Sequence, residues 1–362
     1  MKKLTLVLVV LLIAAGMVMA DVTVGGWGRI EFGVTGNNTS GSKPMVVAGP
    51  GWAGGGRVGI AINGSSDNVG FSLNINSNGG SIGIGDNANI WIKFNDIVML
   101  TLGQAQEDSL RGKVGDIYGA MTGGDQDSIF MRAYPKKGAV LKLTPVSGLT
   151  AILALDTDNS TTTLEDAFKY IYAGVGYVID GVGFVRLGYN PNDNQWGTAA
   201  SSPVADNTFG YLNFAFQLTA VEGLNADLGV KYNLANTVAG DTVAKVALGA
   251  TYGMDAFGAT LRVDTAFQKD DSNSDTSEFD LNVATDLNYS LDIATFGVVL
   301  ASNNLLDTAN AGTGKAFQVQ PYVKKGYSNG YVRLGVNYLS MLDTGADPSS
   351  VWTIFTTAEY WF

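Results

Sequence analysis

Along most of this chain, apolar and polar residues alternate with a period of two, the pattern of β-strands that have one apolar and one polar face. The segment 69–76, Val-Gly-Phe-Ser-Leu-Asn-Ile-Asn, is typical. After the first twenty residues, no stretch has an amphipathic helical period of useful length. The pattern therefore predicts an all-β fold.

Turns of two different lengths separate the alternating segments. Tight links, such as Asp180-Gly181 and Ser328-Asn-Gly330, favour the positive φ of hairpin turns. Longer polar links are expected at 36–55, 77–87, 158–166, 191–206, 270–276, 307–314 and 342–349. Short turns on one side and long loops on the other are typical of an antiparallel up-and-down β-barrel.

Placing one strand between each loop and the next turn predicts eighteen strands, an even number that returns both chain ends to the same side. The expected strands are 24–35, 56–63, 69–76, 88–94, 97–103, 137–145, 149–157, 167–180, 182–190, 207–219, 224–235, 241–254, 257–269, 277–291, 293–306, 315–327, 330–341 and 350–362. The segment 128–134 is assigned to a loop, because counting it as a strand would exchange the sides of the later turns and loops. Sixteen strands is the alternative, since two short early segments could form one strand.

A soluble β-sandwich would show the same alternation, but no other element in the sequence would cover so many apolar strand faces. Several tyrosines lie near strand ends, where they suit the two interfaces of a bilayer: Tyr170, Tyr172, Tyr189, Tyr232, Tyr252, Tyr289, Tyr338 and Tyr360. Strands cross a membrane only as a closed barrel, because every backbone polar group must be hydrogen-bonded within the protein. The sequence therefore predicts a transmembrane β-barrel.

The N-terminus has the features of a secretory signal. Lys2 and Lys3 precede the apolar run 4–18, and Val18-Met19-Ala20 provides a site for cleavage before Asp21. A transmembrane anchor is the alternative, but the run is short for a bilayer. We expect residues 1–20 to be a cleaved signal peptide and 21–362 to be a single barrel domain.

The composition excludes several classes of function. The chain has no cysteine and no histidine, so disulfides, the usual zinc sites and Ser-His-Asp or Cys-His nucleophile systems are excluded. The net charge of −11 disfavours nucleic acid as a partner. The segment 156–160 begins like a calcium loop but lacks its glycine and its glutamate. We expect no enzymatic activity, no cofactor and no metal site.

The longest expected link, at about 104–136, follows the fifth strand. A link of this length in a compact fold is usually functional or disordered, and we expect it to fold inward as a constriction loop. An ordinary surface loop is the alternative. The charged residues expected at the narrowest part of the channel are Glu107, Asp108, Arg111, Lys113, Asp116, Asp125 and Asp127.

The alternation also places nine basic residues on the polar faces of the strands. They are Arg29, Arg57, Lys93, Lys142, Arg186, Lys231, Lys245, Arg262 and Arg333. A basic wall opposite an acidic loop would create an electric field across the channel and orient polar solutes. Any one of these residues could instead pair with a neighbour such as Glu31 or Asp264.

The final segment, 352–362, has an apolar or nearly apolar residue at every second position and ends in Tyr360-Trp361-Phe362. Chain ends are usually solvated and frayed, so this ending is expected to face lipid. It resembles the last strand of Gram-negative outer-membrane barrels. The resemblance implies that the barrel-assembly machinery recognises Tyr360 and Phe362 as an assembly signal.

The signal sequence, the long link after the fifth strand, the aromatic ending and the opening segment 24–29 together resemble the Gram-negative general porin superfamily. The segment 107–115 is also similar to spirochaete-type outer-membrane porins. The resemblance implies a homotrimer in the bacterial outer membrane, in contact with lipid and lipopolysaccharide, that passes small hydrophilic solutes. One difference is the loop segment 121–124, Met-Thr-Gly-Gly, where porins often have a Pro-Glu-Phe-Gly-Gly-like stretch.

The predicted function is a water-filled channel for passive diffusion of ions and small hydrophilic solutes. A substrate-selective channel is one alternative, but it would need a stripe of lumen aromatics, for which Trp27, Trp91 and Tyr177 are too few. A non-conducting surface or adhesin barrel is another, and the short polar outer loops count against it.

Overall fold

The computed structural model describes residues 21–38, 42–48, 56–78, 81–112, 117, 120, 129, 131–156, 171–190, 210–234, 242–268, 279–303, 315–342 and 349–362. The expected signal peptide, residues 1–20, lies outside the described residues. Within these ranges, no helix is long and apolar enough to cross a membrane.

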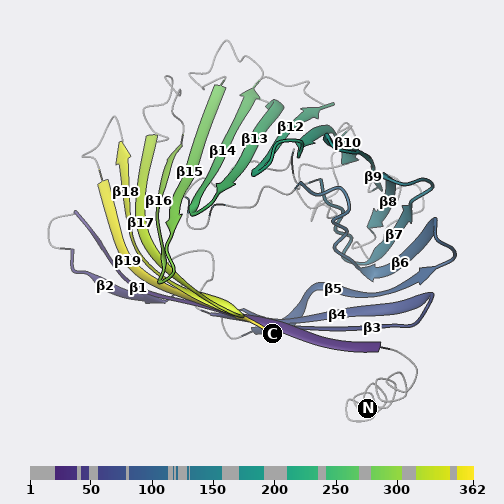
Figure 1. Cartoon of the computed structure of the whole chain (residues 1–362), viewed down its shortest axis with the longest axis horizontal. Helices are drawn as coiled ribbons and strands as arrows, with labels where there is room; N and C mark the ends of the chain where they lie inside the picture. Colours follow the sequence, from purple (N-terminus) through teal and green to yellow (C-terminus); the bar gives the residue numbers. More distant parts are fainter. Residues whose placement is uncertain are drawn as a thin grey trace.

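The described residues form one antiparallel sheet that closes on itself (Figure 1). The first strands are β1 (Asp21–Asn37), β2 (Met45–Ala48), β3 (Arg57–Ser65), β4 (Val69–Asn78), β5 (Ser81–Lys93) and β6 (Val98–Gln104). The middle strands are β7 (Gly138–Leu143), β8 (Leu149–Asp156), β9 (Ile171–Ile179), β10 (Gly183–Asn190), β11 (Tyr211–Leu218) and β12 (Leu224–Asn233). The last are β13 (Thr242–Met254), β14 (Phe257–Gln268), β15 (Phe279–Ser290), β16 (Thr295–Asn303), β17 (Lys315–Tyr327), β18 (Gly330–Leu342) and β19 (Ser349–Trp361).

From β3 onward each strand pairs with the next one in the chain, and β19 pairs with β1 to close the ring. The strands β2 and β3 share one position, because both pair with the same side of β1, β2 with 32–35 and β3 with 21–29. The nineteen strands therefore fill eighteen positions. The predicted eighteen-stranded antiparallel barrel is confirmed, and the sixteen-stranded alternative is wrong.

Two of the expected loops contain strand residues well inside their expected bounds. The loop expected at 77–87 is wrong, because β4 continues to Asn78, β5 begins at Ser81, and the two strands pair throughout this region. Ile82 and Ile84 keep the alternation there, but the glycines and polar residues around them have low strand propensity and concealed it. The loop expected at 36–55 likewise contains β2.

The described residues of the segment 128–134, namely 129 and 131–134, form no strand of the wall, as predicted. They contribute only an isolated β-bridge between Ala133 and Glu107. The long link between β6 and β7 therefore does not enter the ring as an extra strand.

The alternation places apolar side chains on the outside of the ring and polar ones on the inside. On β1, Ile30 and Phe32 are 56% and 55% exposed, whereas Glu31 between them is 2% exposed on the inner face. On β10, Leu187 is half exposed beside the fully buried Arg186. This distribution is the reverse of that in a soluble protein and is typical of a barrel with an apolar exterior.

Side chains and backbone together join the two ends of the sheet. On the inner face, the Arg29 guanidinium forms an ion pair with Glu359 (Nη2 to Oε2, 2.6 Å), which also accepts a hydrogen bond of 2.9 Å from the Tyr331 hydroxyl. Beyond the last ladder pair, Phe362 exchanges two backbone hydrogen bonds of 2.9 Å with Gly26. The seam between β1 and β19 therefore leaves no open edge along its paired length.

Candidate functional site

The link between β6 and β7 packs against the inner face of the barrel. Apolar side chains from both of its ends are buried together with inward-facing residues of β7, β8, β9 and β11. This cluster contains Ala105, Leu110, Met131, Ala133, Val140, Ile152, Ala154, Tyr172 and Ala215, with Phe184 of β10 beside it. The described parts of the link, here called the inner loop, therefore lie inside the ring next to these strands (Figure 1).

Glycines on β9 and β10 form a seat for the inner loop. A Cβ atom on Gly176 would lie 2.7 Å from the Cδ2 atom of Leu110, and one on Gly174 would collide with the other methyl of the same leucine. On β10, a Cβ atom on Gly188 would lie 2.6 Å from the Cε atom of Met131. Because these positions have no side chain, the loop side chains pack directly on the strand backbone.

A buried ion pair holds two distant points of the inner loop. Arg186 on β10 and Asp227 on β12 are both fully buried and form an ion pair. The Arg186 guanidinium also donates hydrogen bonds to the backbone carbonyls of Leu110 (3.2 Å) and Ile129 (3.0 Å). One side chain of the wall therefore fixes both the outgoing and the returning limb of the loop.

The approach of the loop to this ion pair requires a glycine. A Cβ atom on Gly112 would lie 2.7 Å from an Asp227 carboxylate oxygen and 3.0 Å from Nη1 of Arg186. Removing one member of a buried ion pair leaves an uncompensated charge and costs about 3–5 kcal/mol. The pair and its glycine therefore act as one unit that positions the loop.

Ion pairs also join the two limbs at the start of the loop. Asp108 pairs with Arg132 of the returning limb and with Arg111, 3.6 Å away on its own limb. Glu107 accepts a hydrogen bond of 2.8 Å from the backbone N–H of Ser109 and lies 3.7 Å from the Nζ atom of Lys142 on β7. The acidic residues here have basic partners at short range, so part of their charge is compensated locally.

The inner loop also reaches the far side of the barrel. Ile117 is buried against residues of β15, β16 and β17, namely Ala284, Val299, Ala301 and Tyr322. Ile129 is buried against Ala247 of β13. The described residues of the inner loop therefore contact the inner face at β7 to β11, at β13 and at β15 to β17.

The structure describes three of the seven charged residues expected at the constriction. Glu107, Asp108 and Arg111 lie at the start of the inner loop, in the ion pairs described above. The other four, Lys113, Asp116, Asp125 and Asp127, lie outside the described residues.

The nine basic wall residues do not form one exposed strip. Arg186, Lys231, Arg262 and Arg333 are at most 3% exposed, and the Arg333 guanidinium lies 3.8 Å from the centre of the Tyr322 ring. Lys231 lies over Tyr211 and directly opposite Lys245 in the register of β12 and β13. These buried or stacked cations therefore contribute to the packing of the barrel wall.

The remaining basic residues are more accessible. Arg57 is half-buried and stacks over Trp27, with 5.7 Å between the guanidinium carbon and the ring centre. Lys93 is the last residue of β5, and in the β5–β6 turn its Nζ atom forms an ion pair of 2.7 Å with the exposed Asp96. The hydrogen bond and charge of Lys93 lower the pKa of the Asp96 carboxyl group.

Sequence reasoning missed the residues that hold the loop against the wall. Leu110, Met131 and the glycines have no reactive or charged side chain, and Asp227 is one of many acidic residues, so no motif singled them out. Two features of the sequence could have indicated this contact. Residues 151–155 of β8 are apolar on both faces of the strand, and glycines stand two residues apart at 174 and 176. A strand that is apolar on both faces must be covered on both sides.

No model of a known protein family and no curated protein matches the sequence. Several solved structures of outer-membrane channels are similar in fold. The anion-selective porin from Comamonas acidovorans is 13% identical, with a TM-score of 0.52, and the match covers 95% of this chain and 100% of that chain. The outer membrane channel DcaP of Acinetobacter baumannii is 14% identical, with a TM-score of 0.51 and coverage of 95% and 98%.

Pseudomonas aeruginosa OpdL is 10% identical, with a TM-score of 0.56, and the match covers 94% of this chain and 99% of that chain. At such low identities these likenesses establish the fold alone. The chain has the fold of Gram-negative outer-membrane porins, so the resemblance to that superfamily is confirmed at the level of the fold. The similarity to spirochaete-type porins stays a prediction.

The glycine seat can be tested by adding a side chain to it. In a Gly174→Val variant, the valine would displace Leu110, and overpacking of this kind costs about 1–3 kcal/mol. We expect trypsin to cleave after Arg111 about tenfold faster, because cleavage follows the population of the open loop. The matched control is Gly253→Val on β13, where a Cβ atom would meet nothing within 4 Å. Equal cleavage of the two variants would show that the seat does not hold the loop.

Proposed function

We propose that this chain is an outer-membrane porin that forms a water-filled channel for passive diffusion of ions and small hydrophilic solutes. It would be exported by a cleaved signal peptide, residues 1–20, and inserted into the bacterial outer membrane. The observation that carries the proposal is a closed barrel of eighteen strand positions, apolar outside and polar inside, whose inner face is contacted by the described residues of the inner loop. It acts as a channel and not as an enzyme.

The width of the barrel supports a water-filled interior. About eight strands give an interior that side chains can fill, whereas sixteen to eighteen leave an aqueous channel. The inner faces here carry charged and amide side chains, which water can solvate. The inner loop narrows this space, and its two anchors on opposite walls fix where the narrowing lies.

The ion selectivity of such a channel depends on which charges remain accessible. We propose that the seven charged loop residues and the nine basic wall residues set the electric field at the constriction. Arg57 is the wall residue best suited to act on a passing ion, because it is only half-buried and its guanidinium stacks over the uncharged ring of Trp27. Arg333, held between two aromatic rings and 3% exposed, is much less accessible.

The partners follow from the same proposal. The exposed apolar side chains on the outer face of the barrel would contact membrane lipid and, in the outer leaflet, lipopolysaccharide. Tyr360 and Phe362 are 56% and 61% exposed, and their rings stack at 6.4 Å on the outer face, where an assembly factor could recognise them. A homotrimer is the assembly that the porin resemblance implies.

Conductance in planar bilayers tests the channel. Purified protein should give stepwise, ohmic conductance increments, because a water-filled pore conducts in proportion to the applied voltage. Stable insertion with no conductance would contradict the proposal and favour a structural or adhesin barrel.

Reversal potentials in a salt gradient test the contribution of Arg57. An Arg57→Ala variant should shift the reversal potential toward cation selectivity, because it removes a positive charge that a passing ion can approach. Arg333→Ala is the matched control, since it removes the same charge from a buried position, and its shift should be smaller. An unchanged potential in Arg57→Ala would exclude that residue from the ion path.

The role of the aromatic ending is tested by assembly. Deleting Phe362 should reduce the amount of folded barrel in the outer membrane, measured as the heat-modifiable band on a gel, far more than the conductance of those barrels that form. Phe257→Ala removes an outward aromatic that is 40% exposed at the same turn side of the barrel and serves as the control. Equal loss in both variants would mean that any interfacial aromatic has this effect.

A further inference from the structure

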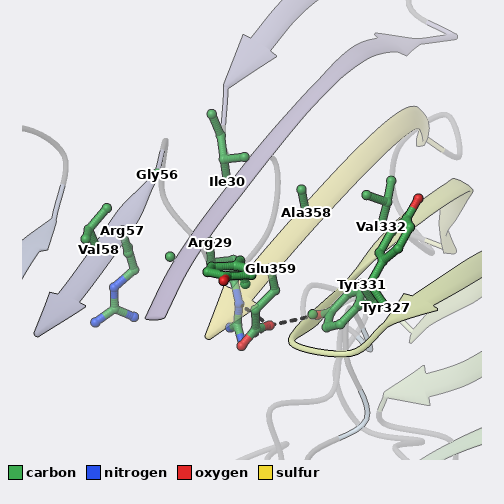
Figure 2. A pocket seen from close by; sticks show the side chains of 13 residues that line it. Arg29, Ile30, Gly56, Arg57, Val58, Tyr327, Tyr331, Val332, Ala358 and Glu359 are labelled. Carbon is green, nitrogen blue, oxygen red and sulfur yellow. Dashed lines mark hydrogen bonds and ion pairs between the residues drawn. The ribbon is translucent and has the colours of Figure 1, made fainter. Parts of the chain in front are cut away.

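The outer face of the barrel has a hollow at the seam where the sheet closes. Its volume is about 610 Å³, and residues of β1, β3, β17, β18 and β19 line it. Figure 2 shows the side chains of Ile30, Ala358 and Val332 on one side of these strands and the ion pair of Arg29 with Glu359 on the other. The hollow therefore lies on the apolar outer face, behind the ion pair that closes the seam. We call it the seam groove.

The register of the strands explains why this part of the outer face is hollow. Gly28 on β1 and Gly330 on β18 both lie opposite Tyr360, one on each side of it. In the next row, Ala358 lies between Ile30 and Val332. Three positions with small side chains thus adjoin large ones, and the floor of the groove is lower than its walls.

We propose that the seam groove binds one acyl chain of a glycerophospholipid. The inference rests on the proposed function, because it requires the outer face to lie in a bilayer. The walls are apolar and exposed, with Ile30 at 56% and Val58 at 52%. An unfilled groove would forfeit the dispersion contacts of its lining, and a single flexible hydrocarbon chain has the shape to restore them.

A cation lies beside the groove, on the strand next to Val332. Lys325 is exposed on the outer face of β17, directly opposite Val332 of the groove and two residues before Tyr327. Its ammonium group donates one hydrogen bond, of 3.3 Å, to the backbone carbonyl of Asp292, and an ammonium group has three donors. Tyr327 and Tyr360, 63% and 56% exposed, bring two hydroxyl-bearing rings to the same end of the groove.

This end of the groove is the end next to a tight turn. The strands β17 and β18 are joined by residues 328 and 329 only, directly after Tyr327. Tight turns lie on the periplasmic side of such barrels, where aromatic residues mark the interface and lipid phosphates are found. The groove, its tyrosines and Lys325 together therefore match a phospholipid of the periplasmic leaflet, with its chain in the groove and its phosphate at Lys325.

Native mass spectrometry of the full barrel, released from detergent in the presence of phosphatidylglycerol, tests the proposal. The wild type should retain one lipid per chain. Ala358→Leu fills the groove, so we expect at least about tenfold less retention, the effect of losing two or more methylene contacts. The matched control is Ala250→Leu on the outer face of β13, away from the groove, which should retain lipid as the wild type does.

Two further variants keep the test decisive. Gly28→Val narrows the groove without a clash, because a Cβ atom at Gly28 meets only a Val58 methyl at 4.0 Å, and it should behave like Ala358→Leu. Lys325→Gln should lower phosphatidylglycerol retention about fivefold, the effect of one cation near a lipid phosphate.

Equal retention by the wild type, Ala358→Leu and Ala250→Leu would overturn the proposal. So would dissociation of a multimer by Ala358→Leu with unchanged lipid retention, because the groove would then be an interface between copies of the chain. Conductance of the same preparations separates this inference from the porin proposal. A silent barrel that still loses its lipid in Ala358→Leu would contradict the channel function and leave the lipid site in place.

Discussion

The closure of the backbone hydrogen-bond ladder between β1 and β19 is the constraint on which the rest of this structure depends. Once eleven residue pairs join the last strand to the first, no sheet edge remains there to be covered, and the chain needs no second layer. The strands can then be apolar on the outside. The inner faces are free to carry charge, which the sequence supplies as buried or half-buried arginine, lysine, aspartate and glutamate side chains.

Closure of the sheet forms the wall, and the described residues of the inner loop pack against the inner face of that wall. The docking of the loop depends on a local exception to the pattern of the barrel. On β8 and β9 the inner face is apolar or has no side chain, as at Ile152 and Gly176, where most of the other strands carry polar groups inward. The loop supplies the missing apolar cover through Leu110 and Met131, and Arg186 satisfies two of its buried carbonyls.

The sequence predicted the strands of the wall, but it did not predict the contacts that hold the inner loop against that wall, for one physical reason. Strand residues obey a period of two that can be read locally, so the strand β18, expected at 330–341, is observed at Gly330–Leu342. The position of the loop depends on contacts between residues far apart in the chain, such as Arg186 with Ile129, which no local pattern encodes. The prediction of a loop at 77–87 was wrong for a related reason. The pairing of β4 with β5 outweighs the weak strand propensity of the glycines and asparagines in this segment.

The distribution of ion pairs bears on how selective a channel of this kind can be. Arg29 with Glu359, Arg186 with Asp227 and Asp108 with Arg132 each combine opposite charges within one contact. The field of such a pair falls off faster with distance than that of a single charge, so a hydrated ion a few ångströms away experiences little of it. Charges of this kind hold the barrel and its loop together. In the proposed channel they would contribute less to the electric field than the more accessible charges, among them the half-buried Arg57 that stacks on Trp27.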